Sequence, residues 1–393
     1  MKLENQKISL IMPVNNCLDQ LIFLLKQLKS QTLKPSEIII VDSSNNLKIS
    51  NYISTNNFIF KIIYKKLNNS YPGKSRNYGF NYSRYSFIAL LDVKTIPINN
   101  WLETYIKYLN KNEIGVIFGC TKYEANTYKS KLIQGATFGN INHETTPGTL
   151  VKREIFNKFL FIENVRSGDD LEWRIKIKKN AKTFTPNNFF LNYKFLPNSF
   201  LTFAFKYFIY ALHNSRVNVQ KNIKDLYLAI FIIFLSLFIP RWNYLIGNWN
   251  DNPLYLPNIT KYYFLILIIF FILINIFNIE YRKKFFFSKY IIKLIVFIFF
   301  SIGIYKWNSF VIHIIENTIF YIPHITKLYL VFLAITSILY RGLYLPINRN
   351  ISLKFLFPFN FILIGFYGLT LDLIKAPGYI FGSIFNFLKF KKI

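Results

Sequence analysis

The stretch "EIIIVDSSNN", residues Glu37–Asn46, decides the fold class of this chain. Its first part is apolar up to an acid, Asp42, and a turn-like run of Ser and Asn follows. A strand that does not alternate between apolar and polar residues is buried on both faces, which is typical of a parallel sheet covered by helices on both sides. The stretch therefore predicts a central strand of an α/β domain.

Segments on either side of this strand repeat the pattern. Further apolar strands are predicted at 8–14, 60–66, 87–92 and 114–120. Helices are predicted between them, at 18–31, 74–83 and 99–109; in the first, Leu18, Ile22, Leu25 and Leu28 recur at helical spacing. Strands that alternate with helices predict a Rossmann-like α/β domain with a mainly parallel sheet.

Polar residues follow several of these strands. Asn15 and Asn16 come after the first, Asp42 ends the second and Asp92 ends the fourth. Ligands of open parallel sheets bind outside the carboxyl ends of the strands, so these four residues indicate a binding site at one sheet edge. The alternative for Asp42 and Asp92 is that each is a turn acid that caps its loop.

The remainder of the chain has a different composition. Up to about Tyr193 apolar residues come in short runs, whereas after about Leu226 they form long blocks such as 262–277 and 328–340. A membrane span needs about 17–25 mainly apolar residues. We therefore expect a cytoplasmic domain at 1–222 and a transmembrane domain of four to six helices at 223–393.

The junction of the two regions contains aromatic residues mixed with basic ones. Residues 197–218 read "PNSFLTFAFKYFIYALHNSRVN", a pattern typical of an amphipathic helix that lies at the membrane interface. The alternative is a packing helix of the soluble domain, which shows the same apolar pattern.

The net charge of +29 raises the question of a nucleic-acid partner. No recognition module accompanies the lysines, so we expect no nucleic-acid binding. Basic clusters such as "EYRKKFFFSK" (Glu280–Lys289) instead fit cytoplasmic loops of a multi-pass protein of the inner membrane. The first residues contain too short an apolar run for a secretory signal, which also favours a cytoplasmic domain.

Six motifs occur in a fixed order along the first half of the chain. They are "IMPVNN", "IIIVDSSNN", "GKSRNYGFNYS", "LLDVKTIPINNWLE", "GTLVKREIF" and "SGDDLEWR". In this order and spacing, residues 8 to about 215 resemble the family 2 glycosyltransferases of the GT-A fold. The resemblance implies a nucleotide-diphospho-sugar as donor substrate and a role in building cell-envelope glycans.

The resemblance also implies roles for individual residues. Pro13, Val14, Asn15 and Asp42 would hold the base and ribose of the nucleotide, and Arg76 and Asn77 would line the donor pocket. Asp92 would begin the Asp-x-Asp motif that contacts ribose and metal. In the later acid pair, Asp170 is expected to be the catalytic base, with Asp169 as the second candidate.

The chemistry of sugar transfer supports these expectations. A leaving diphosphate needs cationic groups or a metal, and Lys74, Arg76 and Arg174 are candidates. An inverting transfer needs a carboxylate that accepts the proton of the acceptor hydroxyl, which the pair Asp169–Asp170 can supply. For the same pair, capping of a helix N-terminus is the alternative role.

Lys94 stands where the resemblance implies the second Asp of the metal motif. Mg²⁺ or Mn²⁺ prefers oxygen ligands, which an ammonium group does not provide. Three hypotheses follow: Lys94 offsets the charge of the diphosphate in a weakly metal-dependent enzyme, a metal still binds through Asp92, or the chain binds nucleotide sugars without catalysis. An exposed lysine without a role is the fourth alternative.

Three further residues are weaker candidates for acceptor or phosphate contact. His143 and Glu144 each have either this role or a structural one. For Trp173, near the acid pair, the alternatives are stacking on a sugar ring and packing in the core. Core packing is also expected of Trp101.

The acceptor class is inferred from the membrane region. Polymer-building relatives carry a Gln-x-x-Arg-Trp motif, but Phe238 stands where that Gln would precede Arg241 and Trp242. We therefore expect a single transfer to a membrane-associated acceptor, either lipid-linked or a glycolipid. The alternatives are an inactive nucleotide-sugar-binding subunit and a transporter with a sensing domain.

Overall fold

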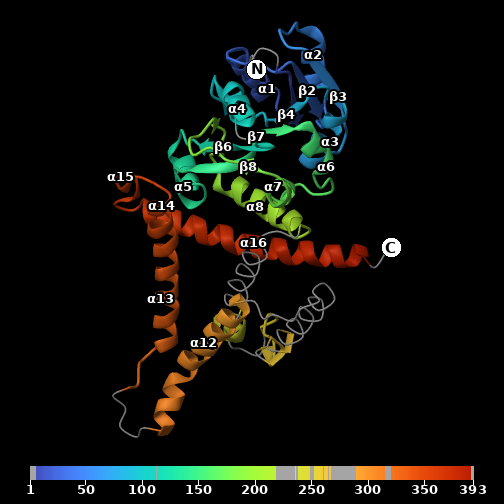
Figure 1. Ribbon diagram of the computed structural model, residues 1–393. Coiled ribbons are helices and arrows are strands. Elements are labelled where there is room, and N and C mark those ends of the chain that lie inside the picture. The colour runs from blue at the N-terminus through green and yellow to red at the C-terminus, as the bar shows by residue number, and fades with distance from the viewer. Residues whose placement is uncertain are drawn as a thin grey trace.

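A computed structural model describes residues 6–111, 113–217, 235, 238–247, 252–259, 261–263, 265–266, 289–314 and 320–390 of the 393-residue chain. An α/β domain occupies the N-terminal half, and long helices from the C-terminal half lie beneath it (Figure 1). The N-terminal domain therefore has its own core, as the change in composition predicts.

The domain is built around one sheet. Its strands are β1 (Ile8–Val14), β2 (Glu37–Asp42), β3 (Ile62–Lys66), β4 (Phe87–Leu90), β5 (Thr95–Pro97), β6 (Val116–Tyr123), β7 (Asn142–Lys152), β8 (Thr183–Phe184) and β9 (Leu191–Tyr193). They are ordered β3-β2-β1-β4-β7-β6-β9-β5, with β8 paired to β6. Four of the five strands predicted from apolar runs match β1 to β4, and the fifth overlaps β6.

Helices connect these strands and cover the sheet. They are α1 (Leu18–Lys29), α2 (Lys48–Thr55), α3 (Pro72–Asn81), α4 (Trp101–Lys111), α5 (Tyr128–Ala136), α6 (Arg153–Lys158) and α7 (Asp169–Asn180). The helix α8 (Phe200–Asn214) follows the last strand, within the predicted interfacial segment 197–218.

The sheet is mixed: five of its strand pairings are parallel, in line with the predicted mainly parallel sheet, and three are antiparallel. Strands β3, β2, β1 and β4 are parallel, but β7 runs antiparallel to both β4 and β6, and β9 runs antiparallel to β5. The sequence of β7, "NHETTPGTLVK", contains Pro147 and Gly148 and carries no continuous apolar run. Pro and Gly are both unfavourable inside strands, so the sequence of this segment does not predict a strand. Its pairing with β4 and β6 makes it one.

The parallel part of the sheet places several strand ends together. In the register of β1 with β2, Val14 lies beside Asp42, and in that of β2 with β3, Asp42 lies beside Lys66. Ile11 of β1 pairs with Leu90 of β4, so Asp92 emerges from the sheet at the same edge. The carboxyl ends of these strands therefore form the edge at which the sequence predicts a site.

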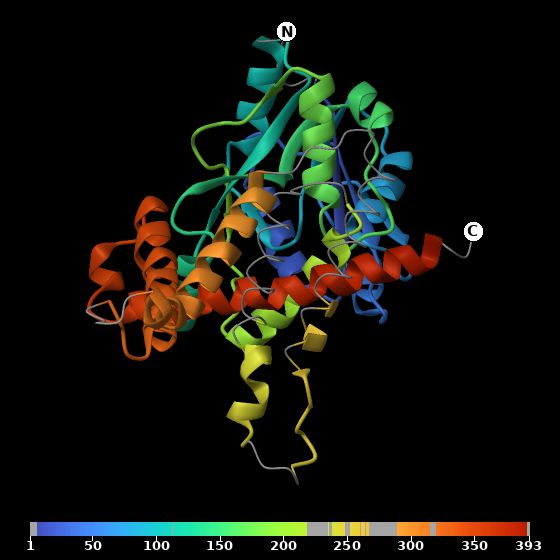
Figure 2. The same cartoon turned by 90° about the horizontal axis from the view of Figure 1, so that it is seen from below.

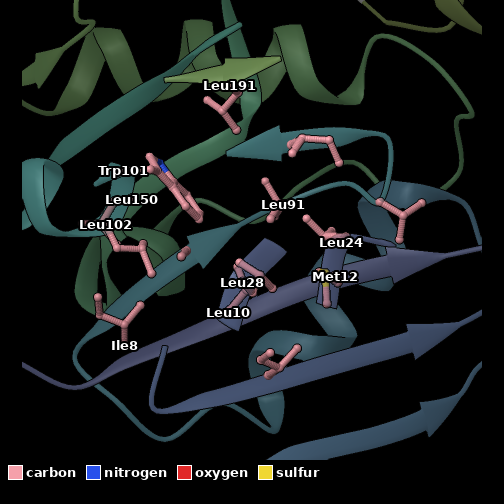
Figure 3. Close-up of a cluster of buried hydrophobic side chains, with 14 of the residues drawn as sticks. Ile8, Leu10, Met12, Leu24, Leu28, Leu91, Trp101, Leu102, Leu150 and Leu191 are labelled. Atoms are coloured by element: carbon pink, nitrogen blue, oxygen red, sulfur yellow. The ribbon is translucent and has the colours of Figure 1, made fainter. Parts of the chain in front are cut away.

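The core stabilises this edge from one face of the sheet. Met12 and Leu10 of β1, Leu24 and Leu28 of α1 and Trp101 of α4 are fully buried in one cluster (Figure 3). Trp101 also donates a hydrogen bond from its indole N–H to the carbonyl of Gly148 in β7, at 3.0 Å. The predicted core role of Trp101 is confirmed.

The C-terminal half contributes α10 (Trp242–Leu245), α12 (Lys289–Ile314), α13 (Ile325–Leu339), α14 (Leu345–Asn348), α15 (Leu353–Leu356) and α16 (Asn360–Phe390), with the short turns η2 (Ile239–Arg241) and η3 (Tyr340–Tyr344). The helix α13 points away from the α/β domain, whereas α16 runs along its underside, across the direction of α13 (Figures 1 and 2).

Two helical segments of the described residues are long and apolar enough to cross a membrane, Val331–Asn348 and Asn360–Gly382. Core helices of soluble proteins also meet this criterion, but only 11% and 33% of these two segments are buried. The predicted count of four to six spans stays a prediction, because the block 262–279 lies largely outside the described residues.

Helix α16 packs closely on α8 through two glycines, Gly378 and Gly382, one helical turn apart. A Cβ atom at Gly378 would lie 2.7 Å from the carbonyl oxygen of Phe208, and one at Gly382 would lie 2.2 Å from that of Leu212. Small residues at this spacing let helix backbones approach each other, as is common in membrane helix pairs. The position of α8 therefore depends on α16.

Replacing Gly382 tests this packing. We expect Gly382→Ala to lower the midpoint of thermal unfolding of the purified chain by several degrees, because the backbone of α8 must move to admit the methyl group. Gly303→Ala, in α12, is the matched control, because a Cβ there has no atom within 4 Å among the residues that the structure describes. Helix propensity makes the control neutral or stabilising. Equal midpoints for the two variants would contradict the close packing of α8 and α16.

Candidate active site

The centre of the site is a guanidinium group that joins two carboxylates. Arg76 of α3 contacts Asp92, which follows β4, at 3.0 Å (Nη2 to Oδ1), and Asp169, the first residue of α7, at 3.1 Å (Nη1 to Oδ2). Asp169 lies 93 residues from Arg76 in the sequence, so the contact joins the two halves of the domain. The arginine and Asp169 are each only 3% exposed.

The local sequence explains why Arg76 is buried. The face of α3 that carries Gly73 packs against α7 and the loop before it. A Cβ atom at Gly73 would lie only 2.3 Å from the carbonyl oxygen of Ile162. The ring of Phe161 lies beneath the guanidinium, with its centroid 5.2 Å from Cζ. Arg76 was predicted to bind phosphate, but its two terminal nitrogens contact carboxylates instead, so the structure makes it a positioning residue.

Burial and the charge of the partner shift the pKa values of Arg76 and Asp169 in opposite directions. Burial disfavours the charged form of Arg76, but Asp92 and Asp169 outweigh it, so the pKa of the arginine is raised above its ordinary value. Burial raises the pKa of Asp169 to about 6, although the neighbouring Arg76 acts to lower it. A carboxylate this buried and this close to an arginine serves to hold that arginine.

The two acids of the pair differ in access. Asp170 is partly exposed, whereas Asp169 is buried beneath it. Gly168, just before them, has a φ of 91°, a left-handed conformation that glycine adopts without strain, and α8 approaches it closely at Asn214. The structure therefore favours Asp170 over Asp169 as the group that can meet a reactant.

Asp42 is wholly buried at the same edge. Its Oδ2 atom accepts hydrogen bonds from the hydroxyl of Tyr64 (2.7 Å) and from Nζ of Lys66 (3.1 Å), and its Oδ1 accepts one from the backbone N–H of Ser44 (2.8 Å). Tyr64 and Lys66 were not among the predicted site residues, although both lie at the end of the apolar run of β3. Asp42 is thus held in place by its neighbours.

Burial and nearby charges also connect Asp42 with Asp92. The thiol of Cys17, at the start of α1, has a pKa raised by burial, and Lys94, Asp42 and Asp92 all act on it electrostatically. Strands β2 and β4 both pair with β1, and Arg76 joins Asp92 to Asp169, so Asp42, Asp92 and the acid pair follow the same edge of the sheet. That they form one binding site stays a prediction.

Three predicted site residues have buried side chains. Val14 is 2% exposed and its side chain packs in the core, so only its backbone is available to a nucleotide, and that contact stays a prediction. The amide of Asn77 bonds the backbone N–H and carbonyl of Phe161 and the carboxylate of Glu163, so it fixes this loop and does not line a donor pocket. Trp173 is fully buried, stacks on Phe161 and donates to the carbonyl of Phe159, which leaves no face for a sugar.

Two other candidates have partners within the protein. Arg174 donates to the backbone carbonyl and to Oε1 of Glu144, at 2.6 and 3.1 Å. A ring nitrogen of His143 lies 2.8 Å from the carbonyl of Phe138, and burial lowers the pKa of this imidazole. The structure thus gives both residues a role in fixing β7. Asn15 and Lys74 are exposed and Pro13 is partly exposed, so these three remain available to a ligand.

Lys94 lies within a tight turn that follows the site acid. The backbone N–H of Thr95 donates to the carbonyl of Asp92 at 2.9 Å, which leaves Val93 and Lys94 as the central residues of the turn. Burial, followed by the nearby charge of Lys206, lowers the pKa of Lys94. The turn places Lys94 just beyond Asp92, at the carboxyl end of β4.

These residues do not fit a divalent metal ion. Within the described part of the chain, no three His, Cys, Asp or Glu side chains come together as a metal-binding group. Oδ1 of Asp92 contacts Arg76, and the position where a second carboxylate is expected carries the cationic Lys94. Hard cations need several oxygen ligands, and of the acids at this edge Asp92 and Asp169 are already paired with Arg76.

Two tyrosines pack together at the ends of β6 and β9. Tyr123 of β6 and Tyr193 of β9 have ring centroids 5.2 Å apart. Burial raises the pKa of Tyr193, and the charges of Tyr210, Tyr123 and Asp92 raise it further. Sequence analysis missed Tyr123 and Tyr193, since isolated tyrosines in strands carry no signal of their own.

Removing the central arginine tests its role in stability. We expect Arg76→Met to lower the free energy of unfolding by about 3–5 kcal/mol, because it leaves Asp169 buried without its cationic partner. Arg84→Met, at an exposed arginine at the end of the same segment, should change it by less than about 0.5 kcal/mol. Denaturant unfolding of both variants measures the difference, and similar losses would contradict the proposed bridge.

The raised pKa of Asp169 predicts a pH dependence of stability. In the folded chain Asp169 holds its proton up to about pH 6, whereas in the unfolded chain it releases it near its ordinary pKa. Its contribution to stability is therefore complete at low pH and is lost as the pH rises through about 6. Relative to Asp169→Asn, wild type should lose stability between pH 4 and 7. A relative gain over this range would show that Arg76 lowers the pKa instead.

Comparison with known proteins identifies the domain. Residues 9–165 match the model of the family described as glycosyl transferase family 2. An "uncharacterized glycosyltransferase" of Rickettsia bellii is 30% identical over 182 residues, which are 43% of this chain and 26% of that relative. One of Methanocaldococcus jannaschii is 29% identical over 191 residues, which are 44% of this chain and 65% of that relative. The match thus spans less than two thirds of either relative.

Solved structures also resemble the chain. Staphylococcus aureus TarS (residues 1–349) in complex with UDP-GlcNAc has a TM-score of 0.40 at 17% identity, over 63% of this chain and 77% of that one. The mannosyltransferase PcManGT of Pyrobaculum calidifontis, in complex with GDP-Man and Mn²⁺, has a TM-score of 0.41 at 15% identity, over 54% and 64%. From the family match, residues 9–165 of this chain form a glycosyl transferase family 2 domain.

Proposed function

We propose that the chain is an inverting glycosyltransferase that moves a sugar from a nucleotide-diphospho-sugar to a membrane-associated acceptor, lipid-linked or a glycolipid. One observation carries the proposal: the partly exposed Asp170 directly follows Asp169, which with Arg76 is buried and is joined through it to the partly exposed Asp92 at the carboxyl edge of the sheet. A carboxylate with access to a reactant and a rigid support beneath it is what a general base requires.

The proposed reaction exchanges one bond for another at the anomeric carbon. The acceptor hydroxyl oxygen attacks this carbon from the face opposite the diphosphate, and the bond between the carbon and the diphosphate oxygen breaks. Asp170 takes the proton of the hydroxyl, and the nucleoside diphosphate leaves with the bonding electron pair. Asp169 positions the site through Arg76 and does not meet the reactant.

The proposed donor site lies over the ends of β1, β2 and β4. Asn15 and Pro13 are accessible to the nucleotide, and the backbone around the buried Asp42 is rigid enough to present them. Lys74, exposed on α3, and Lys94 supply positive charge for the diphosphate. In this proposal cationic side chains, in place of a bound metal, stabilise the leaving group.

The membrane part of the proposal rests on exposed apolar surface. On α8, Leu201 and Phe205 are exposed while Phe203 and Ala204 are buried, so the helix presents an apolar face away from the domain. On α13, Val331, Phe332 and Ile335 are also more than half exposed. A bilayer would cover these side chains. We propose that the chain sits in the inner membrane, with the catalytic domain on the cytoplasmic side.

The alternatives are an inactive binding subunit and a transporter with a sensing domain. Neither of these two functions needs a catalytic base. Here Asp170 is in place as a base, and the buried Asp169 and Arg76 hold the segment that carries it. The supported choice is therefore an enzyme.

Asp170→Asn tests the catalytic role. We expect the rate of sugar transfer by this variant to fall by about 10²–10⁴-fold, because amide nitrogen and oxygen cannot accept the proton, while donor binding stays within about twofold of wild type. Asp19→Asn, at an exposed acid of α1, is the matched control and should keep full activity. If Asp170→Asn transfers sugar at the wild-type rate, Asp170 is not the base.

Chelation tests the metal-free donor site. Transfer by wild type should continue in excess EDTA, because Lys94 occupies the position of the second metal carboxylate. Lys94→Asp should make transfer dependent on added Mg²⁺ or Mn²⁺, with a large loss on chelation. A wild-type enzyme that EDTA inactivates and Mg²⁺ or Mn²⁺ restores would refute a lysine-based site.

A further inference from the structure

Three charged side chains meet where η3, at the end of α13, crosses α16, and we call them the crossing cluster. Nε of Arg341, in η3, contacts Oδ2 of Asp372 in α16 at 3.0 Å, and Nζ of Lys375 contacts Oδ1 of the same carboxylate at 3.3 Å. The three side chains are 13%, 20% and 17% exposed, respectively. The proposed sugar transfer uses none of them. Charged residues between apolar helices are rare and mark functional sites.

Glycines bring the two helices together at the crossing cluster. A Cβ atom at Gly365 of α16 would lie 2.5 Å from the carbonyl oxygen of Ile338 in α13. One at Gly368 would lie 3.2 Å from Cβ of Arg341, so the stem of this arginine rests on α16. Its guanidinium then meets Asp372, one helical turn further along. The position of Arg341 is therefore fixed by backbone packing as well as by charge.

The two helices take different directions from this crossing. Helix α16 follows the underside of the α/β domain, because Ile364 packs on Gly135 of α5 and Gly378 packs on α8. Helix α13 points away from the domain (Figures 1 and 2). In the proposed membrane location, α16 lies along the bilayer surface and α13 enters the bilayer. The crossing cluster then lies at the level of the lipid head groups.

Side chains around the crossing cluster suit the boundary between head groups and hydrocarbon. Tyr340 and Tyr344 of η3 are both at least half exposed and stack on each other, with ring centroids 5.3 Å apart. Tyrosines are enriched at this level of a bilayer. Ile335 of α13 and Phe366 of α16 are exposed apolar side chains. A lipid whose head group contacts the crossing cluster would therefore place its chains on apolar surface.

Charge is not balanced within the crossing cluster, because two cations share one carboxylate and leave a net positive charge. Nη1 of Arg341 donates to Oγ of Ser337 at 2.7 Å. The other terminal nitrogen, Nη2, has no hydrogen-bond partner in the described part of the chain and is not buried. Its N–H groups can therefore donate to an oxygen of a phosphate group.

We propose that the crossing cluster binds the phosphate of a membrane lipid, with Nη2 of Arg341 as the main contact and the lipid chains on the exposed side of α13. The inference rests on the membrane location in the proposed function and adds a binding site to it. Basic sites between membrane helices suit anionic head groups, and the planar guanidinium suits phosphate. A bulk phospholipid and a phosphorylated acceptor lipid present the same chemistry to this arginine.

Helix α8 connects the lipid site with the acid pair. The ammonium group of Lys375 lies over the ring of Tyr207 in α8, 5.0 Å from its centroid. Asn214, two turns and roughly 10 Å further along α8, lies against Gly168, just before the acid pair. A lipid phosphate at the crossing cluster is therefore bound next to the helix that contacts the loop of the acid pair.

Lipid binding to the purified full-length chain, in a neutral detergent, tests the site without requiring turnover. Microscale thermophoresis measures the affinity for dioctanoyl phosphatidylglycerol and for dioctanoylglycerol, which has the same chains and no phosphate. We expect Arg341→Met to weaken phosphatidylglycerol binding by about tenfold, because it removes a charge-assisted contact. Lys354→Met, at an exposed lysine of α15, is the matched control for the loss of one charge and should bind as wild type does. Dioctanoylglycerol should bind all the proteins alike.

A second pair of titrations, with polyprenyl phosphate and uncharged polyprenol, identifies the source of the phosphate. A loss for Arg341→Met with phosphatidylglycerol supports a site for bulk phospholipid. A loss with polyprenyl phosphate alone supports a site for a phosphorylated acceptor lipid. Wild-type affinity of Arg341→Met for both phosphorylated lipids would overturn the inference.

Asp372→Asn separates a lipid site from an ion pair that only stabilises the helices. It breaks the same ion pair as Arg341→Met but makes the crossing cluster more positive, so the phosphorylated lipid should bind about threefold more tightly. A purely structural ion pair predicts the same direction for both variants, and weaker binding by both would contradict the lipid site. Should Arg341→Met not fold, Asp372→Asn decides alone: tighter binding supports the site, and unchanged or weaker binding overturns it.

The two proposals can fail separately. If no nucleotide sugar is cleaved but lipid binding depends on Arg341, the lipid site stands and the enzymatic function fails. If sugar transfer is observed while lipid binding is indifferent to Arg341, the function stands and the lipid site is refuted.

Discussion

The contact of Arg76 with Asp92 and Asp169 is the constraint on which the site depends. It joins a helix in the first half of the domain to the end of β4 and to the start of α7. Each of the three charges would be costly in a protein interior without the others. Because the two acids are fixed by one planar guanidinium, Asp170, which follows Asp169 directly, has a defined position relative to the end of β4.

The order of elements and the location of the site could be predicted from the sequence. Strands β1, β2, β3 and β4 are apolar runs that end near polar residues, and burial of both faces leaves them one way to pair. The partners of the charged residues could not be predicted in the same way. Arg76 and Asp169 are 93 residues apart, so their contact follows from how α7 packs and not from any local pattern.

Packing also explains the corrected predictions. Asn77 directly follows Arg76, but on the helix it faces the loop at Phe161, so its amide completes that loop's hydrogen bonds. Trp173 lies three residues after Asp170, yet its indole points into the core behind the sheet. Asn77 points to a different side of α3 from Arg76, because successive residues of a helix are about 100° apart. Trp173 shares the buried side of α7 with Asp169, four residues before it.

The structure links the site with the C-terminal helices through α8. Asn214 of α8 lies against Gly168, just before the acid pair, while Phe208 and Leu212 pack on α16 and Leu201 and Phe205 are exposed. A single helix thus contacts the loop that carries the acid pair, the packing partner below it and the proposed lipid surface. This arrangement accounts for a soluble fold combined with a strongly apolar second half.

The central claim is that the residues at the carboxyl ends of β1, β2 and β4 cleave an activated sugar from its diphosphate. Release of nucleoside diphosphate from a panel of nucleotide sugars by the purified chain, in detergent and in the presence of lipid extract, measures this most directly. We predict saturable release from one donor or a few related donors. A chain that neither binds nor cleaves any nucleotide sugar in the panel would contradict the account.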